Sequence, residues 1–280
     1  MFAIDPKDTL GLNDAQLDII QRAIALEPMP VDERISDRTY EATATNEAGR
    51  VRLRNFTDPK ISRLTAYRFH RENMLNEHLF HIWPAEGFDF PALTTVIFEM
   101  PQVLILGADL LPIADVVFDR TYYGRWMLGY AEVLKKHWPA LVEHRAGPEP
   151  APDPYFTNQI GSTMSVLMYL KHSGLEPAQA FLLELTEHWT TLHAQAQSRT
   201  DADAAAVEAR RVQLMTKAYK ALDYHSPASD GLASVLGWTG ANLMFDHVFG
   251  PDLEDQGLDH KRTYLEVEVS PGTFSAPRSH

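Results

Sequence analysis

The feature that most constrains the fold is a run of extended segments between residues 39 and 111. These segments alternate in polarity or are continuously apolar, and short links without helical periodicity join them. They are Thr39–Thr45, Arg50–Arg54, Ser62–Arg71, Met74–Trp83, Ala92–Met100 and Gln102–Leu111. Strands joined by such short links pair antiparallel, because a parallel pair needs a long crossover. The sequence therefore predicts an antiparallel sheet, with Arg50, Arg52 and Arg54 on one face of a strand.

Helical periodicity surrounds these strands. We expect a helix within Leu10–Leu26, with Asn13 or Asp14 near its cap. After Asp119, apolar residues recur at helical spacing. This stripe comprises Trp126, Tyr130, Val133, Leu134 and Leu141. Ile160–Leu170 resembles one late strand.

Further helices are expected near the C-terminus. Leu182, Leu185, Trp189 and Leu192 mark an amphipathic helix, and an alanine-rich helix runs from Thr200 to about Leu222. Ser226–Gly250 fits two short helices. Together these elements predict one α+β domain over residues 1–280, folded as a three-layer α/β/α sandwich with a central antiparallel sheet. We expect residues 1–30 to form an N-terminal helical segment and residues 270–280 a disordered tail.

Composition excludes several kinds of chemistry. The 280 residues contain no cysteine, which excludes disulfides, thiolate metal sites, cysteine nucleophiles and cysteine-ligated iron–sulfur clusters. Any electrons that the protein uses must then come from a separate protein. The formal net charge of -13 argues against nucleic acid as a partner. No apolar run approaches the ~20 residues of a membrane span, and no secretory signal is evident, so we expect a cytoplasmic protein.

General catalytic motifs are missing from the sequence. It has no phosphate-binding loop, nucleophile elbow or zinc-binding helix of the usual patterns. His78 and His81 are close in sequence, but in a strand they point to opposite faces of the sheet. We therefore predict no metal site.

Several short motifs follow one another in a characteristic order. Between Arg54 and Pro112 these are Asn73-Met74-Leu75, Trp83-Pro84, Asp89-Phe90-Pro91 and Ala108-Asp109-Leu110-Leu111-Pro112. Towards the C-terminus they are Ile160-Gly161-Ser162, the helix Pro177–Ala196, Ser226–Leu232, Leu236-Gly237-Trp238 and Phe245-Asp246. Over about residues 50–250 this order resembles the ferredoxin-dependent bilin reductases, whose superfamily includes red chlorophyll catabolite reductase.

The resemblance implies a sheet that carries a bilin on one side, with helices closing the pocket. Members of the family reduce double bonds of biliverdin or its relatives. They take single electrons from ferredoxin and protons from side chains, in a radical mechanism without metal or flavin. The resemblance thus implies an external ferredoxin as electron donor and partner, no covalently bound cofactor, and a linear tetrapyrrole as substrate or ligand.

The chain departs from the family at the positions of its acids. The family's two catalytic aspartates fall at Val96 and Ser226, its histidine falls at Leu79 beside His78, and a glutamate of some members falls near Tyr67. Neither Val96 nor Ser226 can transfer a proton. Either the alignment is shifted by one residue, or other titratable residues have replaced the acids. Our catalytic candidates are His78, His81, Glu99, His225 and Asp230.

A second set of residues is expected to bind the substrate. It comprises Tyr67, Val96, Asp109, Ser162, Lys171 and Ser226. Lys171 is a candidate partner of the bilin propionates, because it follows the strand whose counterpart in the family carries an arginine. Arg50, Arg52 and Arg54 could instead pair with the propionates or form a solvated strand face. Asp109 fits a structural role equally well, and Asp230 fits better as the cap of a helix that begins at Gly231.

The sequence leaves two functions open. The first is a ferredoxin-dependent reductase of a bilin or chlorophyll catabolite. The second is a non-reducing tetrapyrrole-binding protein or isomerase, which the apolar Val96 and the neutral Ser226 favour. Their distinguishing property is whether a bound bilin stays unreduced when ferredoxin is supplied.

Overall fold

The computed structural model describes residues 11–44, 46–71, 74–114, 119–147, 162, 164–198, 201–225 and 227–250. Within the helices, it does not describe the side chains of residues 214, 217–219, 221–225, 227 and 228. The predicted C-terminal tail, Ser226 and most of residues 148–163 lie outside the described residues.

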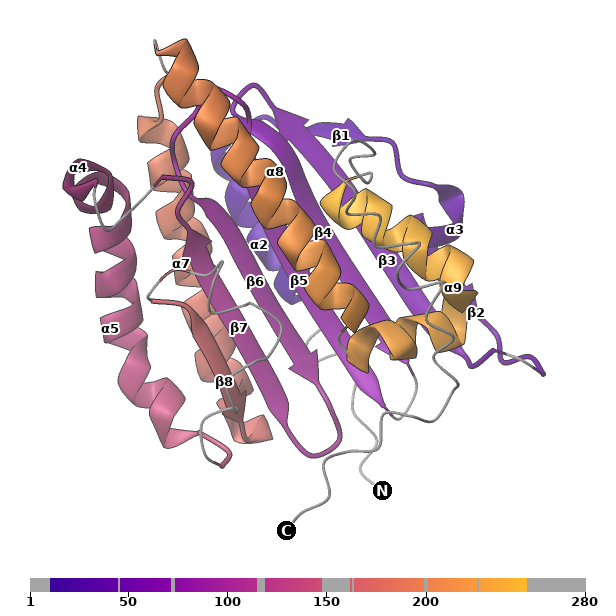
Figure 1. The fold of residues 1–280 in the computed structure, drawn as a ribbon. Coiled ribbons are helices and arrows are strands. Elements are labelled where there is room, and N and C mark those ends of the chain that lie inside the picture. The colour runs from indigo at the N-terminus through magenta and orange to yellow at the C-terminus, as the bar shows by residue number, and fades with distance from the viewer. Residues whose placement is uncertain are drawn as a thin grey trace.

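A large antiparallel sheet forms the centre of the fold, as the alternating segments predict (Figure 1). Its strands are β1 (Glu27–Met29), β2 (Asp37–Tyr40), β3 (Gly49–Asp58), β4 (Ile61–Arg71), β5 (Leu75–Pro84), β6 (Ala92–Glu99), β7 (Leu104–Leu111) and β8 (Val166–Leu170). They are ordered β1-β3-β4-β5-β6-β7-β8, and β2 also pairs with β3. Strand β8 begins at Val166, so it is shorter than the predicted Ile160–Leu170.

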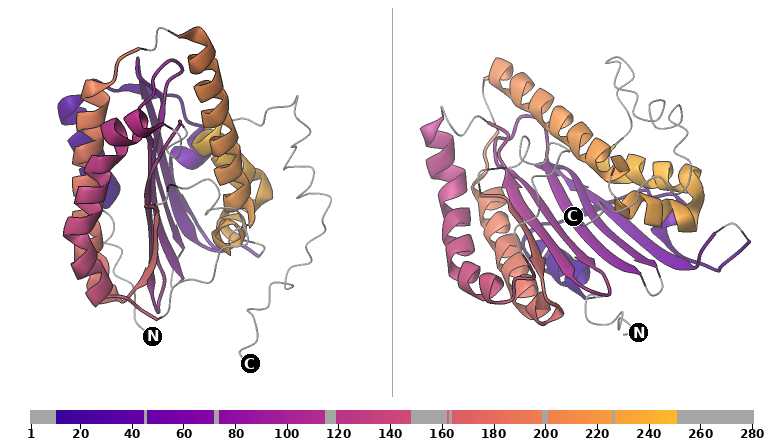
Figure 2. Two further views of the ribbon diagram at one scale, coloured as in Figure 1. Left: turned by 60° about the vertical axis from the view of Figure 1, so that its left-hand side comes forward. Right: turned by 60° about the horizontal axis from the view of Figure 1, so that its bottom comes forward.

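Helices cover both faces of this sheet, which confirms the three-layer sandwich. They are α2 (Leu12–Ala23), α3 (Glu33–Ser36), α4 (Arg120–Tyr122), the π-helical turn η1 (Tyr123–Met127), α5 (Leu128–Glu143), the 3₁₀ turn η2 (His172–Gly174), α7 (Leu175–Gln195), α8 (Ala202–His225) and α9 (Pro227–Phe249). Figure 2 shows the sheet nearly edge-on, with α2, α5 and α7 on one side and α8 and α9 on the other. We call these sides the α2 face and the α9 face.

The larger core lies on the α2 face. The apolar stripes predicted for α5 and α7 point into it, and Trp126, Tyr130, Phe181 and Trp189 are completely buried there. Burying one such side chain stabilises the fold by about 2–3 kcal/mol. This face is therefore closed over most of its area.

Helix α2 is tied to the sheet by buried polar side chains. Its N-cap is Gly11, not Asn13 or Asp14 as predicted. The Asn13 amide instead donates to the backbone oxygen of Tyr67 at 2.6 Å. Gln16 donates to the hydroxyls of Thr95 at 3.1 Å and Thr186 at 2.9 Å, so it joins α2, β6 and α7.

The α9 face carries a smaller core against a kinked helix. Helix α9 changes direction at Gly237, whose φ of 68° lies in the left-handed region that glycine tolerates. The kink accounts for the two short helices predicted here. The helix begins at Pro227, so Asp230 lies in its first turn and does not cap a helix starting at Gly231. Lys220 of α8 donates to Asp246 of α9 at 2.7 Å and holds the two helices together.

Candidate ligand site on the α9 face

The strand register brings together positions that are far apart in the sequence. Tyr67 pairs with Leu79, Leu79 with Val96, and Val96 with Gly107. These residues form one row across β4–β7, and the side chains of Tyr67, Leu79 and Val96 point to the α9 face, where they pack. The positions at which the sequence resemblance expects a glutamate, a histidine and an aspartate therefore lie side by side.

This row is apolar where it crosses β5–β7. A Cβ atom on Gly107 would lie 2.6 Å from Cγ1 of Val96, so Val96 occupies the space that a side chain at position 107 would need. Because Leu79 and Val96 have no titratable group, they cannot transfer protons.

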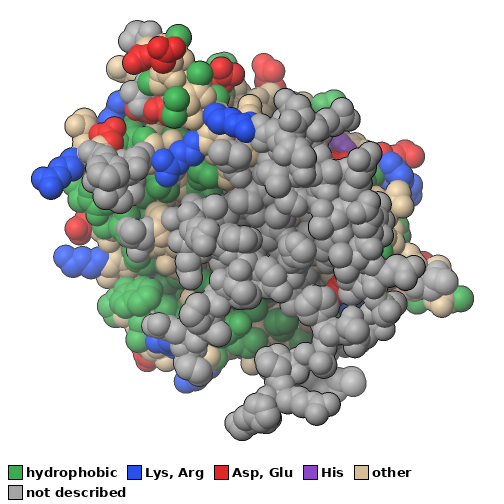
Figure 3. All heavy atoms as spheres, in the orientation of Figure 1, with side chains coloured by type: hydrophobic (Ala, Val, Ile, Leu, Met, Phe, Trp, Pro, Cys, Tyr) green, Lys and Arg blue, Asp and Glu red, His purple; other side chains and the backbone are tan. Residues whose placement is uncertain are grey.

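From Val96 of this row to β8, the described residues cover the α9 face only in part. Val96, Phe98, Ile105 and Tyr169 are half-buried, and Leu167 is 44% exposed. We call these five residues of β6–β8 the open shelf. Figure 3 views this face and shows hydrophobic side chains between and beside the undescribed residues. A surface of this composition fits a flat, largely apolar ligand.

A row of polar side chains borders the open shelf. Thr65 pairs with His81, His81 with Thr94, and Thr94 with Asp109. These residues lie two positions along their strands from the row of Val96, so both rows share the α9 face and are about 7 Å apart. His81 is hydrogen bonded to the Thr94 hydroxyl at 2.7 Å and packs against Phe249 of α9.

Asp109 is the buried acid of this row, with 1% of its surface exposed. Burial raises its pKa to about 7, although hydrogen bonds from Ser162 oppose the shift. The Ser162 backbone N–H donates to Oδ2 at 2.6 Å, and the Ser162 hydroxyl donates to Oδ1. The structure thus joins two predicted substrate-binding residues directly. At neutral pH, a substantial fraction of Asp109 is protonated and able to donate a proton.

His81 complements Asp109 chemically. Burial lowers the pKa of His81 to about 3, so its ring is neutral at physiological pH. A neutral imidazole offers one donor and one acceptor nitrogen. The polar row therefore combines a carboxyl group that retains its proton with a histidine that can accept or relay one.

Two predicted catalytic residues lie on the opposite side of the sheet. His78 and Glu99 point to the α2 face, because each alternates with residues of the α9 core. Glu99 accepts from Asn76 at 3.2 Å. A ligand on the open shelf is separated from both side chains by the sheet. The same holds for Arg52 and Arg54, which contact Asp14 of α2.

The remaining predicted residues lie farther from the Asp109–Ser162 contact or are only partly described. Lys171 is exposed and follows the C-terminal end of β8, whereas Ser162 precedes its N-terminal end. The length of the strand therefore separates the two residues by on the order of 15 Å. Asp230 is exposed in the first turn of α9, and burial raises its pKa. The backbone of His225 ends α8. Its side chain, like Ser226, lies outside the described part.

Sequence reasoning missed Thr94, Thr65 and Gly107 as members of the site. Two neighbouring threonines, Thr94 and Thr95, interrupt a strand that is apolar up to Glu99, and this was the available signal. Alternation assigns them to opposite faces, but the register that places Thr94 between His81 and Asp109 is not visible in the sequence.

Comparison with known proteins gives a likeness in structure alone. No family model matches the chain, and no curated protein matches its sequence. A crystal structure of phytochromobilin synthase from tomato in complex with biliverdin superimposes with a TM-score of 0.70. The two chains are 15% identical, and the match covers 86% of this chain and 83% of the other. The chain therefore shares its fold with this phytochromobilin synthase, in line with the α/β/α sandwich that its sequence predicts.

Proposed function

We propose that the protein binds a linear tetrapyrrole on the open shelf and reduces it with electrons from ferredoxin. The observation that carries this proposal is the half-open apolar surface of β6–β8 beside a buried acid–histidine row. The likeness to a structure that holds biliverdin supports the choice of ligand. In the experiments below, biliverdin represents the linear tetrapyrroles, which include the bilins and the chlorophyll catabolites.

The polar row supplies the proton chemistry of the proposed reaction. Each electron added to a conjugated tetrapyrrole makes the ligand more basic, so reduction requires a nearby proton donor. Asp109 is our candidate donor, because burial raises its pKa to about 7. His81 is the candidate relay through its hydrogen bond to Thr94. Both replace the acid and histidine that the resemblance places at Val96 and Leu79.

Binding is tested by titrating biliverdin into the purified chain and following its absorbance. We expect a saturable red or blue shift at ~1:1 ratio. Ile105→Arg places a charge on the open shelf and should weaken binding about tenfold or more, because the charge loses hydration against an apolar ligand. Leu128→Arg is the matched control, since Leu128 is 52% exposed on α5. Equal affinities for the two variants would argue against the shelf as the binding site.

Reduction is tested by adding a reduced ferredoxin system to the biliverdin complex without oxygen. Loss of the long-wavelength band would support a reductase, and Asp109→Asn should then bind biliverdin but turn it over about a hundredfold more slowly. An unchanged spectrum in the wild-type complex would rule out reduction of this ligand.

A non-reducing tetrapyrrole-binding protein or isomerase is the second candidate function. It is favoured by Val96, which is packed against Gly107 at the position of a family aspartate. Under this function the bound bilin persists with reduced ferredoxin, and Asp109 serves only to anchor Ser162. The two functions share the site and differ in turnover.

A further inference from the structure

A buried acid that the proposed proton chemistry does not use lies at the inner end of the open shelf. Glu77 of β5 pairs with Phe98 of β6. The row continues through Ile105 of β7 to Tyr169 of β8. Glu77 shares the α9 face with these shelf residues, because it lies two positions from Leu79, which packs on that face. Three of the five shelf residues therefore extend from Glu77 in one row across the sheet.

Glu77 lies at the boundary between the open shelf and the core under α9. It is 5% exposed, and the Tyr67 hydroxyl donates to its Oε2 atom at 3.4 Å. Tyr67 itself belongs to the buried core on this face, whereas Phe98 on the other side of Glu77 is half-buried. An apolar residue at this place would avoid the free energy that burial of a carboxyl group costs. The acid is therefore a candidate for ligand recognition rather than for packing.

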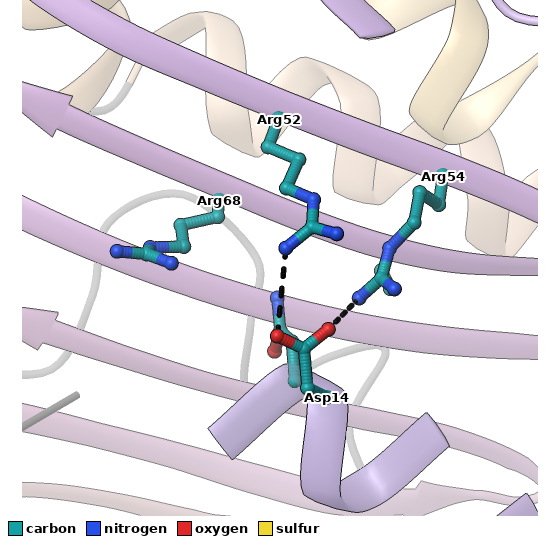
Figure 4. Close-up of a pocket in the computed structure, with 6 residues that line it drawn as sticks. Asp14, Arg52, Arg54 and Arg68 are labelled. Carbon is teal, nitrogen blue, oxygen red and sulfur yellow. Dashed lines mark hydrogen bonds and ion pairs between the residues drawn. The ribbon is translucent and has the colours of Figure 1, made fainter. Parts of the chain in front are cut away.

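The arginine cluster of β3 and β4 lies on the other face of the sheet from Glu77. Arg52 and Arg54 contact Asp14 of α2, and Figure 4 shows Arg68 beside them. The sheet separates these guanidinium groups from a ligand on the open shelf. They cannot therefore turn the surroundings of Glu77 into a site for the carboxylates of a ligand.

Glu77 and Asp109 are two separate acids of the same face. The row of Asp109 crosses β5 at His81, four positions along the strand from Glu77, and Asp109 itself lies two strands away from β5. Strand geometry therefore separates the Cα atoms of the two acids by about 16 Å. Glu77 is too distant for a direct hydrogen bond to Asp109, so its role is distinct from that of the acid–histidine row.

We propose that Glu77 binds the N–H edge of the tetrapyrrole and thereby fixes the orientation of the ligand on the open shelf. A linear tetrapyrrole carries N–H groups along one edge and, in biliverdin, propionate carboxylates along the other. A carboxylate accepts hydrogen bonds from the first edge and repels the second. The N–H edge therefore faces β5, and the propionates point away from it. This inference rests on the proposed function, because it orients the ligand of that site.

Biliverdin and biliverdin dimethyl ester together test this orientation, because esterification removes the propionate charges and leaves the N–H groups in place. Absorbance titrations at constant ionic strength give the dissociation constant of each ligand. Glu77→Gln should weaken both about tenfold, since it keeps the size of the side chain and removes the charge that strengthens the hydrogen bonds. Glu132→Gln is the matched control, because Glu132 is exposed on α5 and its loss changes the net charge equally. We expect wild-type affinities for this control.

Two results with the Glu77→Gln variant would overturn the inference. The first is wild-type affinity for both ligands. The second is tighter binding of biliverdin alone, because the propionates would then face position 77. If wild type binds neither ligand, the proposed function fails and the orientation fails with it, which distinguishes that case from the other two.

A measurement on the wild-type complex does not depend on the folding of a variant. Biliverdin labelled with ¹⁵N and bound to the protein should show at least one N–H proton resonance that is shifted downfield and exchanges more slowly with water than in the free ligand. N–H resonances and exchange rates that match those of the free ligand would contradict the contact with Glu77.

Discussion

Replacing Asp109 by Asn should change how the stability of the protein depends on pH. Burial raises the pKa of Asp109 to about 7 in the folded chain, while an aspartate in an unfolded chain titrates near 3.9. Between these values the folded state holds a proton that the unfolded state has lost. The stability associated with Asp109 is therefore complete below about pH 4 and declines as the pH rises through about 7.

The size of this decline follows from the two pKa values. A separation of roughly 3 units corresponds to about 4 kcal/mol of unfolding free energy between pH 4 and pH 8. Asn cannot titrate, and its NH₂ group replaces one of the two oxygens that accept hydrogen bonds from the backbone N–H and the hydroxyl of Ser162. That loss costs about 1–3 kcal/mol at every pH. Asp109→Asn should therefore be less stable than wild type near pH 4.5, and more stable near pH 8.

Urea unfolding of both proteins at a series of pH values from 4.5 to 8.5 measures the difference directly. Asp18→Asn, which removes an exposed carboxyl group on α2, is measured in parallel to account for the change in net charge. If the difference between wild type and Asp109→Asn stays constant across the series, Asp109 does not retain its proton and is unsuited to be a proton donor.

Three further predictions concern the packing around the site. Gly107→Ala should destabilise the fold by about 1–3 kcal/mol, because its Cβ would lie 2.6 Å from Val96; thermal unfolding should show that Val96→Ala restores much of this loss, and full additivity would contradict the contact. Burial lowers the pKa of His81 to about 3, so wild type should lose stability as the pH falls from about 6.5; His81→Gln should lose less in chemical denaturation, whereas parallel curves would refute a neutral buried ring. Lys220→Met should loosen α8 from α9 by removing the 2.7 Å contact with Asp246, and faster amide exchange confined to these helices is the expected result; unchanged exchange would show that the contact is dispensable.

The layers of the fold could be predicted because local patterns determine them. Alternation and short links specify an antiparallel sheet, and the stripe that includes Leu182 and Trp189 specifies the buried face of α7. Alternation also places His78 and His81 on opposite faces, as the structure confirms. These properties depend on neighbours within one turn or one strand.

The site itself depends on information that a local pattern does not contain. The contact between Asp109 and Ser162 joins residues 53 positions apart, and the row from Thr65 to Asp109 requires the registers of three strand pairs. The N-cap was mispredicted for a related reason. Asn13 is a good capping residue by type, but its amide instead bonds to the backbone of Tyr67 in the sheet.

The period of a strand explains how a proton-transfer site could be rebuilt on an unchanged sheet. If the family's histidine is aligned one residue before Leu79, it falls on His78. The side chain of His78 points to the α2 face, so the sheet separates it from the open shelf. A shift of two residues leads to His81 and, on the adjacent strand, from Val96 to Thr94, which keeps both side chains on the α9 face. Asp109 extends the same row on β7. The register thus favours our proposal that other residues replace the expected acids over a one-residue error of alignment, because His78 faces α2 whereas His81 and Asp109 share the α9 face with the open shelf.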